Sequence, residues 1–430
     1  MGGGRIQLIS KGAQDKILIN NPQMSFFNSV YNRHTNFSIE CLQVNNNDDY
    51  SINEKTINYK IPRYGDLLYK CHLEIDVPEQ IPDVIPPNYI QYSNNTAHSY
   101  MKQIDVEIGE KCIDRQYGKF YDIQNTLNDT YDEETIMINK HIRKRLYLVN
   151  NVSIIENNLI LPLQFWFCKN PGLALPLIAL QYHDVNFKIT YRGIKEIINS
   201  SNDIINLTSN PPSIKLWCNF IYLDTDERRN FTQISHEYLI EQVQFNEIPF
   251  SSNVSLNFYH PVKELKWVIQ NNTVIQVGKV YEDSTLNIQS NNSWTENNDF
   301  LNYLSNNTNY QNRINDDLIY DHFDKCNLTF NGVERFPQQN APYFRTIEPY
   351  NNDYKIPQLI QYSNKLIYMY SFALKPKEYQ PSGTCNFSKI DSATLNFTGN
   401  LSSNHTISVY AVNYNILRIM SGMGGLLFGN

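Results

Sequence analysis

The chain has 430 residues and a mass of 50.3 kDa, which suggests two or three domains, and each half of the chain could bury a sizeable core. Its composition, with 13% aromatic and 18% charged residues, argues against a disordered chain. The net charge of −7 argues against a basic groove for nucleic acid, so we expect no direct nucleic-acid contacts.

Alternation of apolar and polar residues predicts a series of β-strands. In residues 69–77, apolar side chains alternate with Lys70, His72, Glu74 and Asp76. The same period of two recurs in residues 104–108, 185–191, 254–258, 393–397 and 407–411. This alternation is typical of a strand with one buried and one solvent-exposed face. Residues 214–223 are apolar at both phases and predict a strand covered on both sides.

Helix is scarce in the sequence. Residues 131–146 favour one surface helix, because acidic residues open the segment and basic residues close it. We interpret Asp132, Glu133 and Glu134 as the charges of its first turn.

The predicted strands form two groups, residues 37–223 and 238–415, with a domain boundary near Asp224. Such strands, separated by Pro- and Asn-rich turns, indicate an all-β protein built from antiparallel sandwiches or barrels. Residues 287–321 are too long for an ordinary connection, and we expect an exposed or functional loop there.

The sequence shows no motif for catalysis, cofactor binding or metal binding. We interpret His183–Asp184 as a pair that caps a turn, and His236 as a solvated or hydrogen-bonded residue at a strand start. Residues 227–229 (Glu-Arg-Arg) predict a charged turn with a structural or interface salt bridge. Residues 422–425 (Gly-Met-Gly-Gly) predict a close-packed tail.

The seven cysteines are scattered, which favours buried free thiols in a reducing compartment. No stretch is long and apolar enough for a membrane helix, and the N-terminus lacks the apolar run of a signal peptide. We therefore expect a soluble chain made in the cytosol.

Asn-x-Ser/Thr sequons are numerous, but Asn is so common here that most are expected by chance. We retain four of them as candidate glycan attachment sites. They are Asn291, Asn306, Asn400 and Asn404.

Five long blocks, in order along nearly the whole chain, resemble the major capsid proteins of nucleocytoplasmic large DNA viruses, most closely the algal-virus type. The first block reads GAQDKILINNPQMSFFNSVYNRHTNF, and the second reads PGLALPLIALQYH. The remaining blocks are Phe220–Gln244, Tyr370–Asp391 and Tyr414–Phe428. No catalytic motif lies among these blocks.

The resemblance implies two consecutive eight-stranded antiparallel jelly-roll barrels with a few short helices in loops. It places an N-terminal segment (1–25) under the barrels, the first jelly roll at 26–223 and the second, with a C-terminal tail, at 224–430. It makes residues 287–321 an outward tower loop. It implies a structural protein, not an enzyme, with no cofactor.

The resemblance also implies an assembly. Homotrimers would form pseudo-hexameric capsomers that tile the icosahedral shell of a large double-stranded DNA virus. The expected partners are neighbouring capsomers, minor capsid and penton proteins, and the internal membrane layer under the N-terminal segment. The chain would be made and assembled in the host cytoplasm and reside in the virion shell.

Two alternatives stay open at this point. A minor capsid paralogue with the same fold would be present in few copies. A carbohydrate-binding jelly-roll module or glycosidase would need an aromatic platform or paired carboxylates in one cleft. The alternating strands show outward charges but no identifiable carboxylate pair.

Overall fold

The structure is a computed structural model that divides into two compact units, Met1–Phe37 and Ser38–Asn430. It describes residues 3–12, 15, 19–46, 48, 50–76, 81–82, 90–92, 96–128, 147–148, 158–193, 196–200, 207–208, 211–272, 301, 303, 321–356, 366–399 and 404–429. The first unit contains helix α1 (Gly3–Ile9), which buries no residue. The second unit contains the β-sheets.

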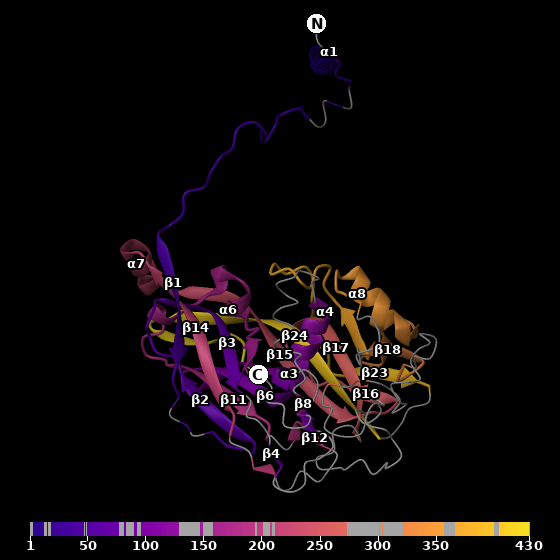
Figure 1. Cartoon of the computed structure of the whole chain (residues 1–430). Coiled ribbons are helices and arrows are strands. Elements are labelled where there is room, and N and C mark those ends of the chain that lie inside the picture. Colours follow the sequence, from indigo (N-terminus) through magenta and orange to yellow (C-terminus); the bar gives the residue numbers. More distant parts are fainter. Residues whose placement is uncertain are drawn as a thin grey trace. The chain divides into compact units, whose positions relative to one another are not determined.

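The first half of the second unit is a barrel made of two antiparallel sheets (Figure 1). One sheet has the order β1–β14–β3–β10, with β9 also on β3, and the other has the order β2–β11–β6–β7. Their strands are β1 (Phe37–Val44), β2 (Lys55–Lys60), β3 (Leu67–Asp76), β6 (Met101–Ile108), β7 (Lys111–Tyr117), β9 (Asn158–Pro162), β10 (Leu175–Pro176), β11 (Val185–Tyr191) and β14 (Ser213–Leu223). Short strands form two further small sheets: β4 (Ile81–Pro82), β5 (Ile90–Tyr92), β8 (Tyr147–Leu148), β12 (Ile198–Ser200) and β13 (Leu207–Thr208).

The second half is a barrel of the same kind. One sheet has the order β15–β24–β17–β21, with β22 on β17 and β25 on β24, and the other has the order β16–β23–β18–β19, with β20 on β18. Their strands are β15 (His236–Pro249), β16 (Asn253–Ser255), β17 (Pro261–Asn271), β18 (Lys325–Phe330), β19 (Val333–Glu334), β20 (Gln339–Asn340), β21 (Ile367–Ser371), β22 (Cys385–Asn386), β23 (Ala393–Thr398), β24 (His405–Met420) and β25 (Met423–Leu426).

The helices of the second unit are short and lie in the connections. Between the barrels, Asp224 caps helix α7 by accepting a hydrogen bond from the backbone N–H of Thr225. The described helices and helical turns are α3 (Thr96–Tyr100), α4 (Gly118–Asn128), α6 (Trp166–Lys169), η1 (Pro171–Leu173), η2 (Leu177–Ala179), α7 (Thr225–Gln233), η9 (Tyr343–Ile347), α8 (Glu348–Asn351) and η10 (Phe387–Lys389).

The two barrels share one strand order and one register. Strand β3 pairs with β14 in the first barrel, and β17 pairs with β24 in the second. Each of these two pairings contains a β-bulge. At each bulge a step of three residues on one strand meets a step of two on its partner. On one side of the bulge, the cross-strand pair Leu68–Phe220 of the first barrel corresponds to Val262–Asn413 of the second. On the other side, Cys71–Cys218 corresponds to Leu265–Ala411. This register makes Trp217 equivalent to Tyr410, and His72 equivalent to Lys266.

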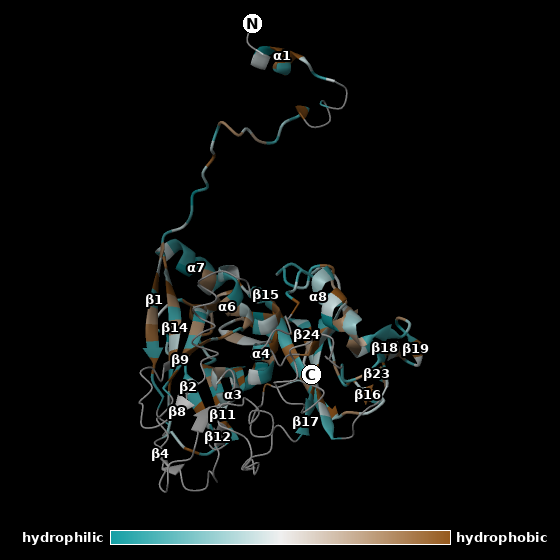
Figure 2. Cartoon of the chain, turned by 45° about the vertical axis from the view of Figure 1, so that its right-hand side comes forward, coloured by the Kyte–Doolittle hydropathy of each residue, from teal (hydrophilic) through white to brown (hydrophobic). Residues whose placement is uncertain are grey.

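Each barrel encloses its own apolar core. Side chains of both sheets, such as Ile57 and Leu73, meet in the first core, and Leu265 and Leu395 meet in the second. The alternation predicted for residues 69–77 is confirmed over β3, where Leu73 is buried and Lys70 is exposed. Figure 2 shows this change of apolar and polar residues along the strands.

Three strand predictions need correction. The polar positions of β6 are not solvent-exposed, because Arg115 covers Asp105 and Lys188 covers Glu107. Strand β24 has no single wet face, because Tyr410 is as deeply buried as Val409. Conversely, β14 is only half-covered on its outward face within one chain.

Two loop predictions have different outcomes. The segment after Asp224 forms helix α7 where we expected a turn, since Asp224 caps it and acidic residues occupy its first turn. The predicted helix 131–146, with Asp132, Glu133 and Glu134, lies outside the described residues, as does most of the loop 287–321.

Candidate functional site

The most distinctive surface of the molecule is the buried interface between its barrels. The sheet β15–β24–β17–β21 is covered on both faces. One face turns Leu265 and Trp267 into the second core. The opposite face packs Val268 and Tyr410 against the first barrel, and both side chains are fully buried. The two barrels are therefore joined as neighbours within one chain.

Aromatic rings form the apolar part of this interface. Tyr117 of β7 and Phe120 of α4 come from the first barrel, and Phe245 and Tyr410 come from the second. The ring centroids of Phe245 and Tyr410 are 4.9 Å apart, and those of Tyr117 and Phe245 are 4.6 Å apart. Each such pair contributes about 0.5–1.5 kcal/mol beyond the area that it buries. This cluster supplies the apolar contact between the barrels.

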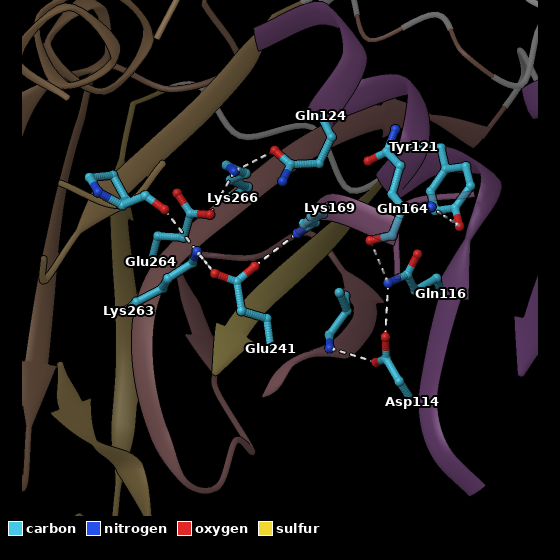
Figure 3. A network of polar contacts seen from close by, with 12 residues as sticks. Asp114, Gln116, Tyr121, Gln124, Gln164, Lys169, Glu241, Lys263, Glu264 and Lys266 are labelled. Carbon is cyan, nitrogen blue, oxygen red and sulfur yellow. Dashed lines mark hydrogen bonds and ion pairs between the residues drawn. The ribbon is translucent and has the colours of Figure 1, made fainter. Parts of the chain in front are cut away.

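A carboxylate with two lysine partners also lies at this interface (Figure 3). Glu241 of β15 pairs with Lys169 of α6 at 2.8 Å and with Lys263 of β17. Burial alone raises the pKa of Glu241, but the two ammonium groups overcome it and lower that pKa to about 2. Glu241 is therefore ionised at neutral pH, and its bond to Lys169 crosses from one barrel to the other.

A second ion pair is completely buried. Lys266 Nζ lies 2.8 Å from Glu264 Oε1, and also donates to Gln124 of α4 at 2.6 Å. The hydroxyl of Tyr354 donates to the other oxygen of Glu264 at 2.8 Å. Burial lowers the pKa of Lys266 to about 8, against the opposing effect of Glu264. Because both charges are fully desolvated, each requires the other and the surrounding hydrogen bonds.

A third polar group, centred on Asp114 of β7, fixes the register between the barrels. Its carboxylate accepts hydrogen bonds from the backbone N–H of Val243 at 3.0 Å and from the Gln116 amide at 2.8 Å. Burial raises the pKa of Asp114 to about 6, although these donors act in the opposite direction. Next to it, Gln242 of β15 donates to the carbonyl of Ile113.

These groups hold two surfaces together. Lysines and carboxylates pair with one another and do not converge on an open cleft. Within the described part of the chain, no group of three or more His, Cys, Asp or Glu residues could hold a metal ion.

The residues singled out in the sequence have structural contacts. Lys60 pairs with Asp184 at 2.6 Å, and the backbone N–H of Gly424 donates to His183 Nδ1 at 3.2 Å. The ring of His236, at the start of β15, lies 2.8 Å from the carbonyl of Phe231, as expected of a hydrogen-bonded residue there. Arg228 forms the expected salt bridge, 3.0 Å from Asp66.

Two of the three glycines in residues 422–425 pack closely, as predicted, whereas a Cβ atom on Gly425 would meet nothing within 4 Å. A Cβ atom on Gly424 would lie 2.7 Å from a methyl carbon of Leu180, which leaves no room for a side chain. Gly422 has a φ of +81° in the turn between β24 and β25, and a Cβ there would lie 2.6 Å from the ring of Tyr182. This end of the second barrel therefore packs against the loop before β11.

One of the four candidate glycan sites is described. Asn404 is exposed next to β24, and its side-chain amide donates to Asn271 at 3.4 Å. The other three, Asn291, Asn306 and Asn400, lie outside the described residues.

All seven cysteines are free, as predicted, and four of them are buried. The exposed ones are Cys41 and Cys112, so burial is not general. Among the described helices, none is long and apolar enough to span a membrane.

Sequence reasoning missed the buried charges of β17. Glu264 and Lys266 alternate with Leu265 and Trp267, which is the pattern of a strand with one wet face. The pattern reports two unlike faces but not what covers the polar one. The first barrel covers the polar face of β17, and the local sequence of β17 contains no signal that predicts this contact.

Comparisons with known proteins identify this architecture. Residues 25–224 match the family "Major capsid protein N-terminus", and residues 227–425 match the family "Large eukaryotic DNA virus major capsid protein". Over the full length of both chains, the protein is 38% identical to the major capsid protein of Pyramimonas orientalis virus. It is 33% identical, again over both full lengths, to that of Paramecium bursaria Chlorella virus 1.

Solved structures agree with the sequence relatives. A chain of the "PBCV-1 virus capsid, quasi-atomic model" superposes with a TM-score of 0.72 at 29% identity, covering 94% of this chain and 100% of that one. The Faustovirus major capsid protein has a TM-score of 0.71 at 13% identity, with 95% and 94% covered, and supports the fold alone. The predicted all-β double jelly roll is confirmed. The chain belongs to the family of major capsid proteins of large eukaryotic DNA viruses.

Proposed function

We propose that this major capsid protein forms homotrimers whose six barrels make a pseudo-hexameric capsomer, and that these capsomers tile an icosahedral shell. The supporting observation is the shared strand order, register and bulge of the two barrels. Three chains with two equivalent barrels each approximate sixfold symmetry with a single gene product. Such a capsomer can pack in a hexagonal array.

The proposal includes the domain organisation. The first jelly roll spans residues 26–223 and the second 224–430, close to the limits of the two family matches. The N-terminal segment, residues 1–25, lies under the barrels and contacts internal capsid components or the internal membrane layer. Its exposed Ile6, Leu8 and Met24 supply apolar contacts for such a partner.

The proposal also includes the setting of the protein. The chain is made in the host cytoplasm, which suits its free thiols, and resides in the virion shell. It acts without enzymatic activity, cofactor or direct nucleic-acid contact, alongside minor capsid and penton proteins. Asn404 and any outward sequon are the positions at which a glycan would be accepted without unfolding.

The native mass of the purified full chain, with negative-stain images of the same sample, tests the proposal. We expect a species of three 50.3 kDa chains with a hexagonal outline. A stable monomer at capsid-like concentrations would contradict the trimer and, with it, the pseudo-hexameric mechanism.

A further inference from the structure

The first barrel has an uncovered face that is the equivalent of a covered face in the second. In the second barrel, the outward residues of β17, β21 and β24 are fully buried beneath the first barrel. They are Lys266, Val268, Ile367 and Tyr410. The common register assigns their equivalents in β3, β9 and β14 of the first barrel. These are His72, Glu74, Ile160 and Trp217, which we call the Trp217 face.

The Trp217 face is only partly buried in the single chain. His72, Glu74 and Trp217 are half-buried, and Ile160 is 37% exposed. Trp217 stacks on His72 with a centroid distance of 6.4 Å, and its Nε1–H donates to Glu74 at 2.7 Å. The face therefore offers a rigid aromatic platform whose polar edge is already satisfied, which is the type of surface that anchors protein interfaces.

One side of the first barrel packs on the second barrel. Within the described residues of a single chain, no barrel packs on the corresponding side of the second barrel. Helix α4 and helix α6 cover the second barrel, from the connections after β7 and after β9. The corresponding connections of the second barrel hold η9 with α8, and the segment after β21. Both expose large apolar side chains: Ile347 is 50%, Tyr350 72% and Leu374 83% exposed. We call these three residues the α8 side.

We infer that the Trp217 face of one copy binds the α8 side of a second copy of this chain, in the way that the two barrels of one chain bind each other. This inference rests on the proposed trimer and names its contact surfaces. The occupant is a second copy because the α8 side is the element that the equivalence of the barrels pairs with this face. The contact continues the pattern of an interface that already exists within the chain.

The charges support the same partner. Within the chain, Lys169 follows strand β9 and pairs with Glu241 of β15. In the second barrel, Lys375 follows β21 and is exposed, and Glu40 is exposed on β1, the strand equivalent to β15. Lys375 and Glu40 therefore occupy the positions in the contact between copies that Lys169 and Glu241 occupy in the contact within a chain.

The contact is heterologous, because it joins two different surfaces. Each copy carries one Trp217 face and one α8 side, so successive copies associate head to tail. Head-to-tail contacts close into a ring of three copies and six barrels when each junction turns the next barrel by one sixth of a full turn. A twofold contact of two Trp217 faces would not use the α8 side at all.

Variants of the full chain test the inference through their native mass in light scattering. Trp217→Glu damages one surface and Tyr350→Glu the other, whereas Thr56→Glu places the same charge on an exposed position of the other sheet. Circular dichroism and the melting temperature verify folding of each variant. Should either fail to fold, Ile160→Glu and Ile347→Glu test the same two surfaces from more exposed positions.

The expected result is a monomer for Trp217→Glu and for Tyr350→Glu, and a trimer for Thr56→Glu. An equimolar mixture of the two monomeric variants should give a species of two chains, since one intact junction remains. Folded variants that stay trimeric overturn the inference and leave the proposed capsomer intact. A monomeric wild-type chain overturns the proposed function and the inference together.

Discussion

Trp217 and Tyr410 occupy equivalent positions in the two barrels, yet only Tyr410 is fully buried within the chain. Tyr410 lies beneath Tyr117 and Phe120 of the first barrel, with ring-centroid distances of 6.2 and 5.5 Å. The chain thus contains one complete junction between barrels and the two separated halves of another. In an assembly of identical chains, the two separated halves can join between neighbouring copies.

Tyr410 allows its ring and its hydroxyl to be separated. Within the described residues, the buried hydroxyl has no hydrogen-bond partner, so Tyr410→Phe should leave the free energy of unfolding unchanged or raise it. Tyr410→Ala removes the ring from the interface and should cost about 3–5 kcal/mol. Urea unfolding of both variants measures the difference, and a large loss on Tyr410→Phe would show that the hydroxyl has an important partner.

Removal of one charge from the pair between Lys266 and Glu264 should be strongly destabilising. Lys266→Met leaves the Glu264 carboxylate desolvated without its cation, at a cost of about 3–5 kcal/mol. The double variant Lys266→Met/Glu264→Gln should regain much of this loss, because no unpaired charge remains. Denaturant unfolding of the two single variants and the double variant gives the coupling energy.

The partly exposed pair of Lys102 and Glu54 is the matched control for the buried pair. Its side chains are 42% and 40% exposed, and Lys102→Met should cost less than about 1 kcal/mol. Equal losses for Lys266→Met and Lys102→Met would contradict the burial of the first pair.

The free energy of unfolding should fall at acidic pH because of Glu241. Its pKa is about 2 in the folded chain against an ordinary 4.5, so the folded state favours the ionised form. The resulting stabilisation, about 3 kcal/mol, is complete above pH 4.5 and is lost as the pH falls toward 2. Glu241→Gln should abolish this part of the pH dependence in unfolding curves, and an unchanged acid limb would count against the ion pairs with Lys169 and Lys263.

Asp114 should act with the opposite sign. Its folded pKa of about 6 lies above the ordinary 3.8, so the folded state favours the protonated form. Its contribution to stability is full below pH 3.8 and falls by about 3 kcal/mol as the pH rises through 6. Asp114→Asn should therefore stabilise the chain at pH 7 more than at pH 4. An equal effect at both pH values would contradict the raised pKa.

Leu73 tests the facing of the strands within the first barrel. It is 1% exposed in the first core, and Leu73→Asp should cost several kcal/mol and abolish the soluble folded chain. Lys70→Asp, on the outward side of the same strand, is the control and should still fold. A normal yield and melting temperature for Leu73→Asp would mean that the faces of β3 are assigned wrongly.

Periodicity predicted the inner faces of the strands well and their outer faces poorly. Leu73, Phe187 and Leu395 point inward as the alternation indicates, because burial of every second residue is a local property of a strand. Whether a polar outer face is wet depends on distant elements. Glu264 is buried by another barrel, and Asp105 is covered by the guanidinium of Arg115.

The apolar outer face of β14 is the complementary case. Residues 214–223 predict a strand covered on both sides, while Trp217 is only half-buried in one chain. The prediction is wrong for the single chain, and in the assembly inferred above a second copy on the Trp217 face would supply the missing cover. Periodicity indicated two groups of strands. That each group folds as a jelly roll was predicted only from the resemblance over long blocks of sequence.

The most direct test of the head-to-tail account is a cryo-EM map of the wild-type oligomer in which individual side chains are resolved. We expect three copies in a closed ring, with Trp217 of each copy buried against the segment around Tyr350 of the next. We also expect the junction between copies to superpose on the junction within a copy. A ring in which Trp217 remains solvent-exposed, or packs against its own counterpart about a twofold axis, would contradict it.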